Sequence, residues 1–326
     1  MSTGTLDALK AVYAEVAQVV SPVFAVGGCV RDALLGEPIK DFDFTTPLLP
    51  DDVEAAIRAA GRRPYIVGKR FGTVGFRLSG RFIEITTFRA ERYEKHNRKP
   101  EVVFLEELDG DLSRRDFTIN AIAYDGEQLI DPFGGRSDLN QGIIRAVGVA
   151  DDRLQDDPLR ILRAARFAAT LGFRVEEELF AAVCIRWPFL AKVSRERWAI
   201  ELEKFLAGAF VWRGLGILRD SGALQLVLPE LAWLDTAQWQ QVETDFALRC
   251  DIPLDSTTDA FADDGSLSYR NLENQRLILL LLAAAKARGL TIEQAQPVVS
   301  EQAQRIAHSL RFSNAQTQDL IRNLMN

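Results

Sequence analysis

Asp41-Phe42-Asp43, eighteen residues after the start of a short apolar segment at 23–26, decides how this chain folds. Apolar residues alternate with the two aspartates, which is the period-2 pattern of a strand with one apolar and one polar face. Side chains two residues apart on a strand point to the same side, so Asp41 and Asp43 can reach one divalent cation. Taken alone, an Asp-x-Asp sequence is more often a turn or a solvated face, so its neighbours decide between the two interpretations.

The upstream neighbour is a glycine turn. The apolar segment 23–26 predicts a buried strand that ends at Gly27 and Gly28, and a helix is expected to begin near residue 30. Glycines let a backbone approach a phosphate closely, and a helix N-terminus presents unpaired N–H groups to an anion. Arg31 can return its guanidinium to the same anion. A glycine pair by itself is usually only a tight turn, and this one matches neither the P-loop nor the dinucleotide-binding fingerprint.

A third carboxylate is expected on a neighbouring strand. Glu84 alternates with the apolar Ile83 and Ile85, as a strand with one polar face requires. The alternative is an ordinary exposed strand position. Asp41, Asp43 and Glu84 together predict a two-metal site that holds Mg²⁺, for which Mn²⁺ is a possible substitute.

Two later segments are rich in arginine. The first is Arg114-Arg115-Asp116-Phe117-Thr118-Ile119-Asn120. The second contains Asp157, Arg160, Arg163 and Arg166, which recur every three residues and would form a slowly drifting polar stripe on a helix. An Asp and an Arg one turn apart can match the hydrogen-bonding edge of a nucleobase. The alternative is an intrahelical salt bridge with solvated arginines.

The distribution of elements predicts an α+β chain. A small mixed β-sheet with helices on one face is expected first, and helices almost exclusively after residue 151. Residues 89–100 are polar, basic and without periodicity, so they predict a mobile loop. The predicted divisions are a head at 1–145, a helical neck at 146–210 and a helical body at 211–326.

Composition narrows the functional class. The net charge of the 326 residues is −7, yet the segment 58–115 holds 14 Lys and Arg against 8 Asp and Glu, a local +6. A basic segment in an acidic protein favours binding of one anionic ligand at one place over non-specific coating of nucleic acid. The alternative is that the basic segment is an ordinary solvated surface. Three distant cysteines, no signal-peptide pattern and no apolar run of membrane-spanning length favour a cytoplasmic protein that spans no membrane. Only two histidines are present, which argues against a Ser-His-Asp triad or a histidine-rich metal site.

Together these segments resemble the class II tRNA nucleotidyltransferases, the CCA-adding enzymes, within the superfamily that also contains bacterial poly(A) polymerases. The resemblance covers about residues 23–206. It implies that 1–145 is a nucleotidyltransferase head, that 146–210 carries an amino-acid template for the nucleobase and that 211–326 binds RNA. It also implies three metal ligands, Asp41, Asp43 and Glu84. The nucleotide-binding residues that it implies are Gly27, Gly28, Arg31, Arg115, Asp116, Asn120, Asp157, Arg160, Arg163 and Arg166, with Asp157 and Arg160 pairing with the base.

The activity implied by the resemblance is template-independent transfer of nucleotides from CTP and ATP to the 3′-hydroxyl of tRNA, with release of pyrophosphate and no obligatory protein partner. An enzyme that adds only A is the main alternative, followed by a CC-adding enzyme, a poly(A) polymerase and a non-catalytic RNA-binding relative. Two features depart from the family pattern. The template begins with Asp156-Asp157 where the family usually has Glu-Asp, and the helical remainder is short, so the tail that grips tRNA is expected to be reduced.

Overall fold

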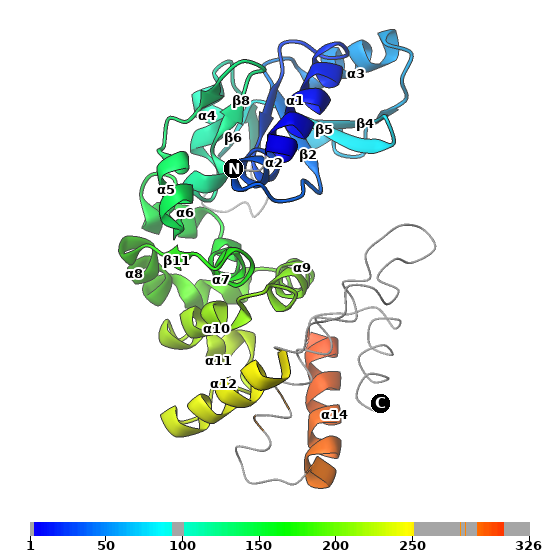
Figure 1. Ribbon diagram of the computed structural model, residues 1–326. Helices are drawn as coiled ribbons and strands as arrows, with labels where there is room; N and C mark the ends of the chain where they lie inside the picture. The colour runs from blue at the N-terminus through cyan, green and yellow to red at the C-terminus, as the bar shows by residue number, and fades with distance from the viewer. Residues whose placement is uncertain (1–2, 93–100, 251–280, 282–283, 285–291, 310–326) are drawn as a thin grey trace. The chain divides into compact units, whose positions relative to one another are not determined.

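The structure is a computed structural model that describes residues 3–92, 101–250, 281, 284 and 292–309 (Figure 1). The chain divides after Asp156 into two compact units, residues 1–156 and 157–326. The first unit contains a mixed sheet and the second is helical, which confirms the predicted α+β class. The finer division of the helical part at residues 210 and 211 remains a prediction.

A seven-stranded sheet forms the centre of the first unit, in the order β3-β4-β5-β2-β1-β8-β9. The neighbouring strands β2 and β5 are parallel, and the other pairs are antiparallel. The strands are β1 (Phe24–Val26), β2 (Phe42–Thr46), β3 (Pro64–Tyr65), β4 (Thr73–Leu78), β5 (Arg81–Thr87), β8 (Ala123–Tyr124) and β9 (Leu129–Ile130).

One face of this sheet is covered by the first three helices, α1 (Thr3–Ala17), α2 (Gly28–Leu35) and α3 (Pro50–Ala59). Helix α2 packs on β1 and β2, α3 packs on β4 and β5, and α1 packs on α2. In Figure 1, α1 crosses in front of the strands. The Tyr13 ring of α1 lies 6.4 Å from the Phe44 ring of β2. The alternating pattern explains the arrangement, because Phe44, Val74, Ile83 and Ile85 are almost fully buried on this side.

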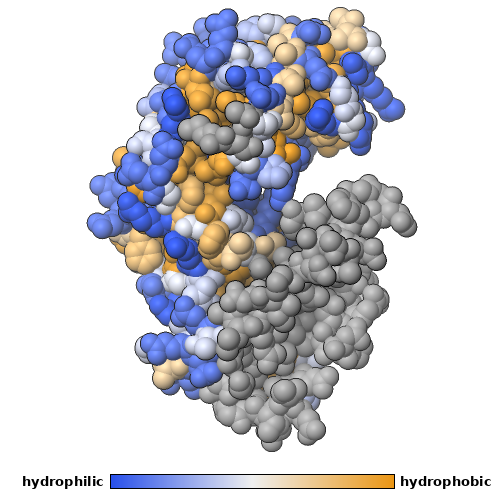
Figure 2. All heavy atoms as spheres, in the orientation of Figure 1, coloured by the Kyte–Doolittle hydropathy of each residue, from blue (hydrophilic) through white to orange (hydrophobic). Residues whose placement is uncertain are grey.

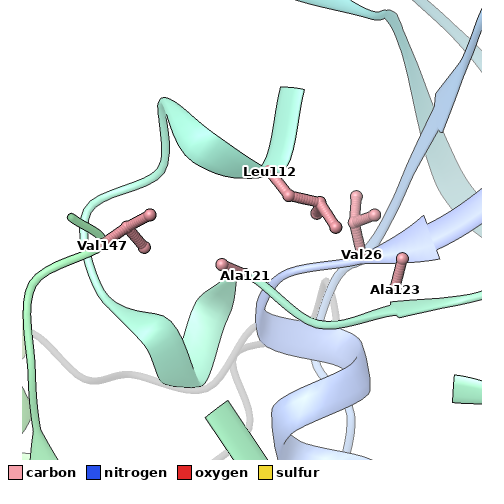
Figure 3. Close-up of a cluster of buried hydrophobic side chains, with 5 residues drawn as sticks. All are labelled: Val26, Leu112, Ala121, Ala123 and Val147. Carbon is pink, nitrogen blue, oxygen red and sulfur yellow. The ribbon is translucent and has the colours of Figure 1, made fainter. Parts of the chain in front are cut away.

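The opposite face is covered only in part by the helix α4 (Leu108–Ser113). Val26, Leu112, Ala121, Ala123 and Val147 form a buried cluster over β1 and β8 (Figure 3). The prediction that helices cover one face of the sheet is therefore confirmed for α1–α3. Helix α4 covers one end of the opposite face. In the view of Figure 2, apolar residues gather in the region of α4, inside a mostly hydrophilic rim.

The segment predicted as a mobile loop is partly a strand. Residues Arg89–Arg92 form β6, which pairs antiparallel with β7 (Glu101–Phe104). The prediction is therefore wrong for residues 89–92, and residues 93–100 lie outside the described part of the chain. Pairing with β7 supplies the backbone hydrogen bonds of β6, so no amphipathic pattern is needed for the strand to form.

The second unit is a stack of helices. They are α7 (Leu159–Leu171), α8 (Glu177–Arg186), α9 (Arg195–Leu206), α10 (Val211–Asp220), α11 (Leu224–Val227), α12 (Thr236–Cys250) and α14 (Ile292–Ser309). Helix α7 packs against α9 and α10. Gly214 permits the close approach of α10, because a Cβ there would lie 2.5 Å from the carbonyl oxygen of Ala165. Trp198 and Phe205 of α9 are almost fully buried between these helices.

Helix α6 (Ala150–Asp156) precedes these helices; it ends before Pro158, and α7 begins after that proline. Within the described part of the chain, no helix is both long and apolar enough to cross a bilayer.

Candidate active site

Two of the three predicted metal ligands lie side by side on the sheet. Asp43 of β2 and Glu84 of β5 are partners in the parallel ladder. Partners in a ladder point to the same face, so both carboxylates project from the face opposite α1–α3. Asp43 is half-buried and Glu84 is exposed. Strand β2 begins at Phe42, which leaves the third predicted ligand, the exposed Asp41, one residue before the strand.

The carboxylate pair is not a closed metal cage. Among the described residues, no group of three or more His, Cys, Asp or Glu side chains is gathered closely enough to hold a metal ion. The oxygens of Asp43 and Glu84 are nevertheless of the type that hard divalent cations prefer. A phosphate oxygen of a substrate can complete such a site, so the two carboxylates fit a cation bound together with a nucleotide.

Cys29 lies next to Asp43 but is not suited to be a ligand of the cation. Its thiol lies 3.5 Å from the backbone oxygen of Asp43 and donates to the backbone oxygen of Val26 at 3.2 Å. Burial raises the pKa of the Cys29 thiol to about 12. The thiol is therefore neutral near pH 7 and packs beneath the site as a small apolar side chain.

The glycine turn joins β1 to α2 and brings two arginines together. Gly27 has φ 74° and ψ −133°, a conformation that favours glycine. A Cβ at Gly27 would lie 2.9 Å from Nη1 of Arg115, and one at Gly28 would lie 3.7 Å from Nη2 of Arg31. Both guanidinium groups therefore lie against the backbone of the turn. Strand β1 is adjacent to β2, so the turn begins one strand away, about 5 Å, from the strand that carries Asp43.

Asn120 and Asp32 together hold the guanidinium of Arg31, whose Nη2 lies 2.7 Å from Oδ1 of Asp32. Oδ1 of Asn120 accepts a hydrogen bond from Nη1 of Arg31 at 2.7 Å, and Nδ2 of Asn120 donates to Oδ1 of Asp116 at 3.1 Å. Asp116 is 8% exposed and also accepts from the backbone N–H of Phe117. Asn120 therefore links Arg31 to the buried carboxylate of Asp116, and Asp116 acts on the site through Asn120.

Asp111, which the sequence analysis did not select, holds Arg115. Its fully buried carboxylate lies 3.3 Å from Nη2 of Arg115 and 2.7 Å from Nη2 of Arg114. The hydroxyl of Thr45 lies 3.4 Å from the same carboxylate. The nearest signal in the sequence is the spacing, because an acid three and four residues before two arginines can pair with both on a helix.

The remaining predicted residues lie in the second unit, on and before α7. Oδ1 of Asp157 accepts from the backbone N–H of Leu159 at 3.1 Å, and Oδ2 lies 2.5 Å from Nη2 of Arg197 in α9. The backbone N–H of Arg160 donates to the backbone oxygen of Asp157 at 3.0 Å. Asp157 thus lies two residues before the start of α7 and is held in place by Arg197 of α9.

Arg163 and Arg166 share a carboxylate that the sequence analysis also missed. Glu201 of α9 lies 3.0 Å from Nη1 of Arg163 and 2.9 Å from Nε of Arg166. The second contact is an ion pair with poor hydrogen-bond alignment, since neither atom forms a hydrogen bond of acceptable geometry there. Both arginines also lie over the Phe167 ring, at 5.6 Å and 4.1 Å from its centroid. These salt bridges run between two helices and not within one, and the nucleotide-binding role of Arg163 and Arg166 stays a prediction.

Comparison with known proteins agrees with this arrangement. Residues 23–145 match the model of the poly(A) polymerase head domain, and residues 172–234 match that of the probable RNA and SrmB-binding site of polymerase A. A crystal structure of the Bacillus stearothermophilus CCA-adding enzyme in complex with CTP is 30% identical, with a TM-score of 0.62, and the match covers 100% of this chain and 83% of that one. This chain belongs to the superfamily of class II tRNA nucleotidyltransferases and bacterial poly(A) polymerases.

Members of the superfamily with higher identity match a shorter part of the chain. The CCA-adding enzyme of Geobacillus thermodenitrificans is 44% identical over 218 residues, which are 66% of this chain and 52% of the relative. The CCA-adding enzyme of Streptococcus mutans is 41% identical over 259 residues, 78% of this chain and 62% of the relative. The match thus spans about half the length of the first of these relatives and less than two thirds of the second.

Proposed function

We propose that this chain is a tRNA nucleotidyltransferase that builds or repairs the CCA end by transferring nucleotides from CTP and ATP to the 3′-hydroxyl of tRNA. The observation that carries the proposal is one arrangement in the first unit. A pair of carboxylates, Asp43 and Glu84, lies beside a glycine turn that is lined by Arg31 and Arg115. Phosphoryl transfer needs these parts, which are charge neutralisation on the phosphates and ligands for a divalent cation. Similarity to CCA-adding enzymes, including one in complex with CTP, supports the choice of reaction and substrates.

The implied cofactor is Mg²⁺, with Mn²⁺ as a possible substitute. Asp43 and Glu84 would hold it, together with Asp41 two residues before Asp43. When bound, the cation lowers the pKa of the attacking hydroxyl and neutralises charge on the leaving pyrophosphate. The carboxylates are suited to this because Glu84 is exposed and Asp43 is half-buried, and because the Cys29 thiol beneath them, whose pKa burial raises to about 12, stays protonated and does not compete for the cation.

The arginines of the first unit would bind the triphosphate. Arg31 and Arg115 present planar donor groups beside a backbone that has no side chain in the way, so phosphate oxygens can approach both the guanidinium and the N–H groups of the turn. Asn120 and Asp111 keep the two guanidinium groups in position before the nucleotide arrives. Such pre-organisation reduces the conformational entropy lost on binding.

Selection of the base would fall to Asp157 and Arg160. A carboxylate accepts and a guanidinium donates hydrogen bonds, so the pair can distinguish the edges of cytosine and adenine from those of other bases. The contact of Arg197 with Asp157 would fix the carboxylate for this purpose. Arg163 and Arg166 would act on the nucleotide less directly, because Glu201 ties both to α9.

The experiment that tests the function uses three tRNA transcripts, which end at the discriminator base, at C and at CC. Each is incubated with the full chain, Mg²⁺ and CTP alone, ATP alone or both. We expect all three to be completed to CCA when both nucleotides are present. Extension of only the CC-ended transcript, by ATP alone, would instead identify an A-adding enzyme. Long homopolymeric tails would identify a poly(A) polymerase.

A further inference from the structure

The sheet face that carries Asp43 and Glu84 also carries a pair of exposed aromatic rings. The ladders place Tyr65 of β3 opposite Gly75 of β4, Gly75 opposite Glu84 of β5, and Glu84 opposite Asp43 of β2. These four residues form one row across four strands, so their side-chain positions share one face. Phe82 is two residues before Glu84 on β5 and points to the same face.

The two rings form a continuous surface because Gly75 has no side chain. A Cβ at Gly75 would lie 2.5 Å from Cζ of Phe82 and within 3.2 Å of two further ring atoms, so the Phe82 ring lies over the glycine. The ring centroids of Tyr65 and Phe82 are 5.3 Å apart, with an interplanar angle of 77°. The two residues remain 42% and 43% exposed. An aromatic ring over a strand glycine can serve the sheet alone, but that role leaves the exposure of the neighbouring Tyr65 unexplained.

One basic side chain flanks the rings. Arg77 is the partner of Phe82 in the ladder between β4 and β5, and it is exposed. Cross-strand partners lie about 5 Å apart on the same face, so a cationic side chain flanks the aromatic pair. Aromatic rings next to basic groups are the combination that binds single-stranded nucleic acid without reading its sequence.

We propose that Tyr65 and Phe82 are a stacking site for the unpaired bases at the 3′ end of the acceptor RNA. The inference rests on the proposed function. It assigns a binding place to the RNA end, for which the predicted metal-binding and nucleotide-binding residues provide none. Phe82 is two residues from Glu84, about 7 Å along the strand, and Tyr65 is two strands away from Glu84, about 10 Å. Both rings are within the span of one or two nucleotides from the carboxylates. A terminal base on Phe82 would therefore leave its own 3′-hydroxyl near Asp43 and Glu84.

Steady-state kinetics of the full chain test the proposal with a CC-ended tRNA transcript and ATP. The variants are Phe82→Leu, Tyr65→Leu and Phe82→Trp, and Phe71→Leu serves as a matched control because Phe71 is an exposed ring outside the row. We expect Phe82→Leu and Tyr65→Leu to raise the KM for the transcript about tenfold, the size of one lost base-stacking contact. The KM for ATP should change less than about twofold in each, and Phe82→Trp and Phe71→Leu should resemble the wild type.

Three results would overturn the proposal. They are an unchanged KM for the transcript in both leucine variants, an equal rise in the KM for ATP, and a Phe82→Trp variant as weak as Phe82→Leu. If Phe82→Leu does not fold, as thermal unfolding would show, Tyr65→Leu decides alone, because its ring does not lie over Gly75.

A second readout keeps this inference separate from the proposed function. A transcript with 2-aminopurine as its 3′-terminal base is titrated with the protein in the absence of ATP. Stacking on the rings should quench its fluorescence for the wild type and less for Tyr65→Leu, whether or not the protein adds nucleotides. Equal quenching by both proteins would contradict the stacking site and would leave the proposed function standing.

Discussion

Two buried carboxylates, one in each unit, each hold a pair of arginines, and the two pairs differ in what lies next to them. In the first unit, Asp111 is fully buried and contacts Arg114 and Arg115. In the second, Glu201 is 7% exposed at its side chain and contacts Arg163 and Arg166. The chemistry of the two clusters is alike, but their surroundings differ.

The difference lies in what the arginines face. Arg115 lies against the backbone of Gly27, where a phosphate can reach both its guanidinium and the turn. Arg163 and Arg166 lie over the ring of Phe167 and link α7 to α9. An arginine in a repeating stripe is thus not by itself a ligand-binding residue. The backbone that it faces is the better guide to its role.

Of the two clusters, that of the first unit should give the larger effect when it is broken. Asp111→Asn removes a buried charge that two arginines share, and loss of one partner of a buried ion pair costs about 3–5 kcal/mol. We expect the free energy of unfolding, measured by urea denaturation, to fall by this order and the KM for CTP to rise at least about tenfold as Arg115 loses its anchor. Wild-type stability together with a wild-type KM would show that Asp111 does not position Arg115.

Breaking the cluster of the second unit should have a smaller effect. Glu201→Gln keeps the size of the side chain and leaves two arginines that still contact the ring of Phe167. We expect a loss of about 2 kcal/mol in the same denaturation experiment and a change of less than about threefold in the KM for CTP. A rise in that KM as large as the one for Asp111→Asn would make the two clusters equivalent and remove the distinction drawn between them.

A change at the glycine turn tests the contact between Arg115 and the backbone. Gly27→Ala introduces a Cβ at φ 74° and 2.9 Å from Nη1 of Arg115, whereas Gly61→Ala introduces one at φ 69° with nothing within 4 Å. Both variants should lose at least about 1 kcal/mol of stability from backbone strain, and Gly27→Ala should lose more, because ψ −133° at Gly27 lies outside the left-handed helical region. Only Gly27→Ala should also weaken CTP binding, about tenfold by isothermal titration. Equal affinities in the two variants would show that the close approach at Gly27 is unimportant.

The smallest effect concerns the thiol under the site. Cys29 is buried and its pKa is raised to about 12, whereas Cys184 is exposed. The folded state keeps the proton of Cys29 up to a higher pH than the unfolded state does. The contribution of this group to stability is therefore fully present below about pH 9 and is lost as the pH rises from 9 toward 12. Iodoacetamide at pH 8 should label Cys184 and spare Cys29 until denaturant is added, as peptide mass spectrometry can measure. Rapid labelling of Cys29 in the native protein would contradict its burial.

The sequence predicted local features of the site well. The strand that carries Asp43, the glycine turn and the polar position of Glu84 follow from periodicity and glycine chemistry, which act over a few residues. The sequence predicted that Glu84 lies on a strand next to that of Asp43, but not that the two residues are direct partners. Register depends on pairing between distant segments, which a local pattern does not show.

Asp111 and Glu201 were missed because burial of a carboxylate is a tertiary property. Each is an acid in an otherwise ordinary helix, and packing brings distant partners to it: Thr45 to Asp111, and Arg163 and Arg166 to Glu201. For Glu201 a signal was present, because Trp198, Leu202 and Phe205 place it beside the apolar face of α9. Strand β6 was missed for a related reason, as its hydrogen-bond partner β7 lies beyond residue 100.

We propose that Asp43 and Glu84 hold the cation that nucleotide transfer needs, and single-turnover addition of CTP to a tRNA transcript by the wild type and by Asp43→Asn tests this claim directly. We expect the rate with Mg²⁺ to fall at least about 10³-fold in the variant, equivalent to about 4 kcal/mol of transition-state stabilisation, while binding of the transcript in a filter assay stays within about twofold. A rate for Asp43→Asn within about tenfold of the wild type would contradict the claim and move the reacting centre away from the row formed by Asp43 and Glu84.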